Sequence, residues 1–360
     1  MFVALREIRA AAGRFALIAG VVALMTLLVG FVSGLAAGLG EKNVSALLAS
    51  NAEHVVFAMP DGQRESFADS AIDEAVAQQW EAAAPGAVTA LGLAQVPLEH
   101  GATGSDSAPV TIFGADVALP TAGELPAGAI ALDAETADKL GVAQGEQIAA
   151  FGAELTVSSI VSRTDHAHMP VAYMTLDTLH SVLDGARQPH AFANVLLIDQ
   201  DALPAGFDTA ALDTHAGTTT TPILPALLAI ESFKSELGSL GLMVLMLMGA
   251  SVLVVGVFFL VWTMQRRGDI AVLKALGAPT AWVARDALAQ AALVLAAGVI
   301  VGGIAVFALG SAASGSVPFL VSWWTLGLPS LGMFIAGLLG ALVSLHQVTN
   351  ADPLTALQNA

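Results

Sequence analysis

The sequence predicts an α-helical membrane protein with four transmembrane helices and an inserted extracytoplasmic α+β domain. Of its 360 residues, 56% are hydrophobic and only 12% are charged, whereas an ordinary soluble domain has about 25% charged residues. Residues 238–264 contain no charged residue, and Arg266 and Arg267 follow them closely. Because a bilayer core of about 30 Å is crossed by roughly 20 helical residues, this run is long enough to span it. A long acidic segment without any such run lies before it, which predicts a separate domain.

The chain begins with a basic and apolar stretch. Residues 1–14 carry Arg6, Arg9 and Arg14 among apolar side chains, the pattern of an amphipathic helix in the membrane interface. Residues 15–39 are apolar and uncharged, which predicts the first transmembrane helix. A cleaved signal peptide is the competing interpretation, but this run is longer than the roughly 7–15 apolar residues of such peptides.

Residues 40–225 have the composition of a folded α+β domain. Alternating apolar and polar residues predict a strand over 88–101 and hairpin strands around glycine within 109–117 and 148–164. Short amphipathic helices are expected over 132–142 and 174–185, and one or two helices within 61–87, ending at Pro85–Gly86. The Thr- and Pro-rich residues 214–225 are expected to form a linker or the mouth of the next helix.

The remaining chain predicts three further spans. An extended second transmembrane segment covers 226–264, followed by a polar and basic connection over 265–286. The third span covers 287–309, a loop covers 310–325 and the fourth span covers 326–345, before a tail over 346–360. Trp323 and Trp324 lie where an aromatic belt is expected.

Basic residues near the spans predict the orientation. The N-terminal segment and the 265–286 connection are rich in Lys and Arg, whereas the 310–325 loop has none. Both termini and the connection are therefore expected to be cytoplasmic, in a multi-pass protein of the cell membrane. The acidic balance of the whole chain, a formal net charge of −17, argues against nucleic acid or anionic lipid as the main partner, while the spans imply contact with membrane lipid. The chain has no cysteine, which excludes disulfides and thiol chemistry.

Three stretches carry a resemblance to a known family. The segment RRGDIAVLKALGAPTAWVARD (266–286), the outer segment IALDAETADKLGVAQGEQIAAFGAELTVSSIV (130–161) and the tail ADPLTALQ resemble the FtsX/MacB-like permeases of ABC transporters, also called type VII. The order of one span, a large outer domain and three more spans is similar as well. The modest size of the outer domain is most like the HrtB/DevC haem-exporter permeases.

The resemblance implies a partner that supplies the energy. The 265–286 region would be a coupling helix docked in a groove of a separate ATPase subunit, which agrees with its apolar face. An amphipathic helix resting on lipid headgroups is the alternative. The coupling residues would be Asp269, Ile270, Leu273, Lys274, Leu276 and Gly277. No GxxxxGK[ST] phosphate loop occurs, so ATP would be bound by the partner. The family implies two copies of the permease and two ATPases.

Candidate cargo residues lie at the outer ends of the first two spans. Helical geometry places Glu231 in line with a stripe of small and apolar residues, which predicts a close-packed dimer seam. The seam residues are Gly238, Leu242, Gly249 and Gly256. Two seams facing each other would bring their Glu231 side chains together above the membrane. Haem is then a transported ligand rather than a resident cofactor, with further candidate contacts at Met25, Phe31, Met243 and Met246. A solvated Glu231 and methionines that only fill packing gaps are the alternatives.

Other chemistry is weakly supported by the residues. His166 and His168 would place both rings on one side of a strand, where haem or a metal would need further ligands; an intrinsic metal site is therefore not predicted. No GxSxG, HExxH or paired-carboxylate pattern occurs, so the chain is expected to be a non-catalytic subunit. The leading hypothesis is export of a hydrophobic or amphipathic molecule, haem first. The alternatives are a signal relay to an extracellular hydrolase or sensor, export of a lipid, peptide or antibiotic, and a membrane-anchored enzyme.

Overall fold

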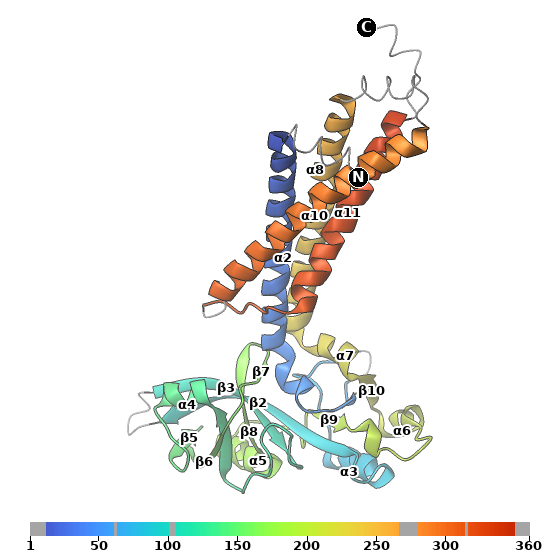
Figure 1. Ribbon diagram of the computed structural model, residues 1–360. Coiled ribbons are helices and arrows are strands. Elements are labelled where there is room, and N and C mark those ends of the chain that lie inside the picture. The colour runs from blue at the N-terminus through green and yellow to red at the C-terminus, as the bar shows by residue number, and fades with distance from the viewer. Residues whose placement is uncertain (1–11, 61–62, 101–105, 266–278, 314–315, 350–360) are drawn as a thin grey trace. The chain divides into compact units, whose positions relative to one another are not determined.

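The chain folds into two compact units, shown in Figure 1. The computed structural model describes residues 12–60, 63–100, 106–265, 279–313 and 316–349. Residues Leu39–Glu236 form one unit, called here the inserted domain. The described residues on either side of it form the helical unit. Four apolar helices and an inserted α+β domain confirm the predicted fold class.

The helical unit is built from four long helices that run side by side (Figure 1). They are α2 (Ala12–Leu48), α8 (Glu231–Gln265), α10 (Thr280–Ala313) and α11 (Trp323–Thr349). The last ten residues of α2 and the first six of α8 belong to the inserted domain. All four are long and apolar enough to cross a membrane. The protein is therefore a multi-pass membrane protein.

Helix boundaries differ from the predicted spans at both ends. Helix α2 continues nine residues beyond the predicted limit at residue 39, through Glu41, Lys42 and Asn43. These polar residues end an apolar run, but they do not end a helix, because none of them breaks the backbone pattern. Helix α8 begins at Glu231, five residues after the predicted start, since the residues before it form two short turns.

Glycines allow helices α2 and α10 to approach closely. A Cβ built on Gly302 would lie 2.6 Å from the Ala23 carbonyl oxygen and 2.7 Å from the Thr26 Cβ of α2. A Cβ on Gly298 would lie 2.7 Å from the Ala19 carbonyl oxygen, one turn away. Such small residues let backbones meet where lipid offers no hydrophobic driving force between helices.

The Gly302→Ala variant is expected to destabilise the helical unit by about 1–3 kcal/mol, because the added methyl group overlaps backbone atoms of α2. Gly303→Ala is the matched control, since its Cβ would meet only the Ser330 Oγ at 3.8 Å. There the change should be neutral or stabilising, as alanine is favoured in a helix. Unfolding by SDS titration in mixed micelles measures both variants. Equal stabilities of the two would contradict the close approach.

The segment before α11 is anchored by an aromatic wedge. The Phe319 ring is buried between α2 and α10, where a Cβ on either Gly34 or Gly310 would lie 2.3 Å from a ring carbon. The Leu320 N–H donates to the Gly34 carbonyl oxygen at 3.1 Å. Phe31 packs on the same ring, with centroids 5.1 Å apart. These contacts fix the entry into α11 against the other helices.

The inserted domain is organised around one mixed sheet. Its strands follow the order β10-β1-β9-β2-β3-β8-β4-β6-β5, and β7 pairs with β8. The pairs β3–β8 and β4–β6 are parallel, whereas the other pairs are antiparallel. The strands are β1 (His54–Phe57), β2 (Val88–His100), β3 (Asp106–Ala115), β4 (Ala129–Asp133), β5 (Gln147–Ala150), β6 (Ala153–Val161), β7 (Asp165–His166), β8 (Met169–Thr175), β9 (Val195–Ile198) and β10 (Thr219–Pro222).

Strand β2 belongs to two parts of this sheet. Its first residues pair with β9, and Leu91–His100 pair with β3. Leu98 and Glu99 also pair with β5, so β2, β3, β8, β4, β6 and β5 close into a ring. Strands β4, β5 and β6 of this ring come from residues 129–161, which include the outer segment that carries the family resemblance in the sequence. The β5–β6 hairpin confirms the predicted strand pair around Phe151 and Gly152.

Short helices cover the sheet. They are α3 (Glu74–Ala83), α4 (Ala134–Leu140), α5 (Leu176–Gly185), α6 (Thr209–Ala216) and α7 (Ile223–Ala226), with single turns η1 (Gln200–Ala202) and η2 (Leu227–Ala229). Along β9, Leu196 packs in the core under Trp80 of α3. Its neighbour Leu197 packs on the opposite face, with Leu47 of α2 and Ala226 of α7. Both faces of this part of the sheet are therefore buried, as alternating side chains require.

The predicted linker over 214–225 is wrong. Its residues form the end of α6, strand β10 and most of α7. Thr219–Pro222 pair with the edge of β1, which supplies backbone partners from more than 160 residues earlier in the chain. Asp213 holds the strand by accepting hydrogen bonds from Thr218 and Thr220. Threonine is common in strands, but four residues whose partner strand is remote in sequence carry no strand pattern of their own.

Candidate functional site

The ends of α2 and α8 meet in a polar group within the inserted domain, called here the junction cluster and consisting of Asn43, His168, Ser232 and Glu236. Asn43 is fully buried, and its Nδ2 lies 2.9 Å from Oε2 of Glu236 and 3.1 Å from the Leu39 carbonyl oxygen. Its Oδ1 accepts from the Ser232 hydroxyl at 2.5 Å. The cluster therefore ties the last turns of α2 to the first turn of α8.

The histidine of this cluster bonds to the glutamate. Nε2 of His168 lies 2.5 Å from Oε1 of Glu236 and 3.0 Å from Nδ2 of Asn43. One ring nitrogen cannot donate to the carboxylate and accept from the amide at once. The shorter contact indicates that Nε2 donates to Glu236, while the two Asn43 amide hydrogens serve Leu39 and Glu236. With the proton on Nε2 of His168, each close contact in the cluster pairs a donor with an acceptor, except the contact between Asn43 Nδ2 and His168 Nε2.

The turn between β7 and β8 carries His168 into the junction cluster. Ala167 and His168 have φ values of 50° and 67°, a left-handed conformation that favours glycine or asparagine. Their N–H groups donate to the Asn43 and Lys42 carbonyl oxygens of α2, at 3.1 and 2.9 Å. Tertiary hydrogen bonds thus hold a backbone conformation that the local sequence disfavours.

A second set of charges fixes the strand beside this turn. Asp165 accepts from Arg163 at 2.9 Å and lies 3.8 Å from Nζ of Lys42, and Arg163 also pairs with Glu135. The hydrogen bond with Asp165 raises the pKa of Arg163, so the guanidinium stays charged. Ser45 of α2 accepts from the Asp165 N–H at 2.8 Å. Helix α2 is therefore bonded to β7 along two of its turns.

The predicted histidine pair is split by this turn. His166 is buried at the end of β7, between the rings of Phe67 and Phe113, whereas His168 reaches the junction cluster. The expected strand gives way to a tight turn, so the rings do not lie on one side. Among the residues that the structure describes, no group of three or more His, Cys, Asp or Glu side chains could hold a metal.

The predicted cargo residues fall into both units. Glu231 lies in the inserted domain, as an exposed residue at the start of α8. The helical unit contains the others: Met25, Phe31, Met243 and Met246. Met243 and Met246 are 48% and 67% exposed, and Met25 is half-buried. The chain by itself thus leaves the two α8 methionines open to lipid or to a partner, and their role in cargo binding stays a prediction.

The predicted seam on α8 divides into an open and a closed part. Gly238 and Gly249 would meet no atom within 4 Å if they carried a Cβ, and Leu242 is 58% exposed. Gly256, by contrast, packs on Gly340 of α11: a Cβ on Gly256 would lie 3.8 Å from the Gly340 Cα. One end of the stripe is therefore used within the chain, and the open end remains the predicted dimer seam.

The predicted coupling residues Asp269, Ile270, Leu273, Lys274, Leu276 and Gly277 lie outside the described residues, as does most of the N-terminal amphipathic segment. Their role stays a prediction from the sequence.

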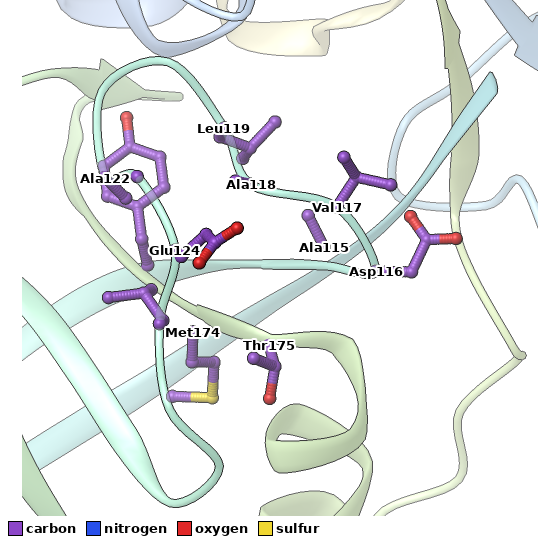
Figure 2. A pocket seen from close by; sticks show the side chains of 12 residues that line it. Ala115, Asp116, Val117, Ala118, Leu119, Ala122, Glu124, Met174 and Thr175 are labelled. Atoms are coloured by element: carbon purple, nitrogen blue, oxygen red, sulfur yellow. The ribbon is translucent and has the colours of Figure 1, made fainter. Parts of the chain in front are cut away.

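A hollow beside strand β3 offers little chemistry. It measures about 410 Å³ and is lined mainly by residues 115–125 and 173–175 (Figure 2). Asp116 accepts from the Ala90 N–H at 2.9 Å, and partial desolvation raises the pKa of its carboxyl. In Figure 2, the carboxylates of Asp116 and Glu124 do not point toward one another. The hollow thus lacks the paired carboxylates of an acid–base site.

Comparison with known proteins shows a family likeness in the C-terminal part of the chain. Residues 241–353 match the family model of the FtsX-like permease C-terminal domain. The part of the chain that contains the last two apolar helices and most of α8 therefore resembles an FtsX-like permease domain.

Two staphylococcal proteins are similar to this chain in sequence. Over 362 aligned residues the chain is 25% identical to the "Putative hemin transport system permease protein HrtB" of Staphylococcus haemolyticus, covering 99% of each chain. A protein of the same description from Staphylococcus epidermidis is 25% identical over 128 residues, or 36% of this chain and 37% of that one.

Two solved structures are also similar in part. The periplasmic region of MacB from Actinobacillus actinomycetemcomitans covers 54% of this chain and 98% of its own, at 10% identity and a TM-score of 0.35. The extracellular domain of the transporter YknZ from Gram-positive bacteria covers 48% of this chain and 91% of its own, at 12% identity and a TM-score of 0.31.

Proposed function

We propose that this chain is the permease subunit of an ABC exporter, which moves a hydrophobic or amphipathic molecule, haem first, from the membrane to the outside, driven by ATP hydrolysis in a partner ATPase. The observation that carries the proposal is the similarity to HrtB from end to end of both chains. The sequence has no phosphate loop of its own. Two permeases and two ATPases would form the working assembly, which the open stripe on α8 supports as a place for a second copy to pack.

The proposed cycle uses the features of α2 and α8. ATP binding would draw the 265–286 segments of two permeases together and close the seam along α8. Cargo entering from the lipid beside the exposed Met243 and Met246 would then be expelled past Glu231. Thioether and carboxylate groups are iron ligands, so these side chains suit haem as a substrate.

Haem is expected to stimulate ATP hydrolysis several-fold when the permease is reconstituted with its ATPase in nanodiscs. Met25→Ala and Glu231→Ala should lower the stimulation and weaken the saturable change in the haem Soret spectrum, because each removes a candidate ligand. Glu74→Ala, on the exposed face of α3, is the matched acidic control and should behave as wild type. Cargo-free ATPase rates measured beside each variant separate a loss of haem binding from a loss of assembly.

A flat response to haem, with no spectral change beyond that of empty nanodiscs, would remove haem as the cargo. A signal relay is then the second candidate, and the junction cluster favours it. Asn43 joins α2 and α8 directly to each other, so a movement of either helix end would reach the β7–β8 turn. A relay would keep its ATPase activity but would show no dependence on any cargo.

A further inference from the structure

A second pocket lies wholly within the inserted domain. Its volume is about 480 Å³, within the roughly 300–1,000 Å³ typical of small-molecule sites. Six separate stretches of chain line it: residues 66–68, residues 93–95 of β2, Thr111 of β3, residues 166–167 at the β7–β8 turn, Asn194 before β9, and residues 229–232, which lead into α8. The pocket therefore joins the sheet to the beginning of the second membrane helix.

Its walls are mostly apolar. Phe67, Leu93 and Ile230 contribute large side chains, and Phe67 stacks edge-on against the His166 ring with centroids 5.7 Å apart. Burial lowers the pKa of His166 to about 4, so the imidazole is neutral near pH 7. A guest in this pocket therefore meets apolar and aromatic surface on several sides.

Two polar side chains of the pocket wall have atoms without partners. Oγ1 of Thr111 and Nδ1 of His166 are buried and make no hydrogen bond, although both residues line the pocket. Asn194, on the same wall, is fully used: it accepts from the Leu93 N–H at 2.7 Å and donates to the Phe67 carbonyl oxygen at 3.2 Å. Buried polar groups in native proteins are nearly always paired, so these two atoms leave unused hydrogen-bonding capacity in residues of the pocket wall.

The charge of the pocket selects the kind of guest. Among the described residues that line the pocket, Glu231 alone is charged, and it is exposed. A carboxylate beside apolar walls favours a cation over an anion of the same shape. An aromatic ring on a short chain ending in an ammonium group would place its ring against Phe67 and its charge near Glu231.

We propose that this pocket is a binding site for small aromatic or alkyl ammonium amphiphiles, a different ligand from the proposed cargo, although Glu231 would serve both. The β7–β8 turn that lines it donates two backbone hydrogen bonds to α2, and Ser232, another lining residue, belongs to the junction cluster. A ligand in the pocket would therefore affect the contacts that join α2 to α8. The site gives the inserted domain a means of sensing small cations outside the membrane.

The test uses the full chain in lipid nanodiscs and three probes with the same ring: phenethylammonium, 2-phenylethanol and phenylacetate. Calorimetric titration should show saturable binding of the ammonium, weaker binding of the neutral alcohol and at least about tenfold weaker binding of the carboxylate. Glu231→Gln should weaken binding of the ammonium about two- to fivefold, the effect of one exposed charge, and leave binding of the alcohol unchanged. Thr111→Val should weaken binding of both the ammonium and the alcohol, since it removes a hydroxyl from the pocket wall without changing the volume of the side chain.

Ala68→Trp places a large ring at an exposed position of the pocket lining and should abolish saturable binding of every probe. Ala82→Trp, at an exposed position of α3, is the matched control and also measures partitioning of the probes into lipid. Binding that persists in Ala68→Trp, or phenylacetate that binds as tightly as phenethylammonium, would overturn the proposal. Haem is absent from these titrations, so their failure leaves the haem-stimulated ATPase result standing.

Discussion

Replacing Phe319 with alanine is expected to lower the free energy of unfolding of the helical unit by about 3 kcal/mol, the largest effect of any single substitution considered. The ring fills the space between Gly34 and Gly310, and neither glycine has a side chain to occupy the void that remains. Loss of a buried phenylalanine costs about 3–5 kcal/mol in soluble cores. The lower end applies because lipid is itself apolar, so that mainly the packing contacts are lost.

Phe307→Ala is the matched control for this experiment. Phe307 lies on α10 with 55% of its surface exposed, so its removal should cost little. SDS titration in mixed micelles compares the two variants. Gly34→Ala should destabilise the wild type, because the new methyl group overlaps the ring, and should be harmless in the Phe319→Ala background. Additive effects in this double-mutant cycle would refute the wedge.

The inserted domain is expected to lose about 3 kcal/mol of stability as the pH falls from about 6.5 to about 4. His166 is buried among Phe67 and Phe113, and burial lowers its pKa from 6.5 to about 4. Above pH 6.5 the ring is neutral in the folded and unfolded states alike. Between these two pH values only the unfolded chain takes up the proton, so acidification favours unfolding.

The His166→Phe variant should lose this part of the pH dependence, because its ring cannot take up a proton. His215→Gln should retain it, since His215 is exposed on α6. Pulse proteolysis of the full chain in urea, at about pH 7 and about pH 4, measures the stability of the inserted domain in each variant. If His166→Phe loses as much stability on acidification as wild type does, carboxylates rather than this histidine set the response.

The membrane fold was predictable because its physical signal is local. Four runs without charge each satisfy their backbone within one helix, and no distant partner is needed to recognise them. The same holds for α4, where Asp133 caps the first turn and Gly141 ends the helix with φ of 65°. Strand β10 was missed because its partner β1 is remote in sequence, and four residues rich in threonine carry no pattern of their own.

The candidate sites were predictable only in part for a related reason. Helical periodicity placed Glu231 in line with Gly249, which needs only the geometry of one helix. It could not show that Gly256 meets Gly340 of α11, since that contact depends on how two helices cross. The pocket beside His166 is lined by six stretches of chain, and no local pattern indicates that they converge. One signal was available for the Phe319 wedge, since Gly30, Gly34 and Gly38 repeat every fourth residue.

The left-handed turn at Ala167 and His168 also bears on the order in which the inserted domain folds. The contact of His168 with Asn43 closes a loop of 125 residues, and the disfavoured turn is held by carbonyl groups of α2. The turn therefore has no stable conformation until the end of α2 has docked, so the β7–β8 hairpin belongs to a late step of folding. The amide protons of Ala167 and His168 would then act as built-in reporters, protected from hydrogen exchange only in chains whose α2 is in place.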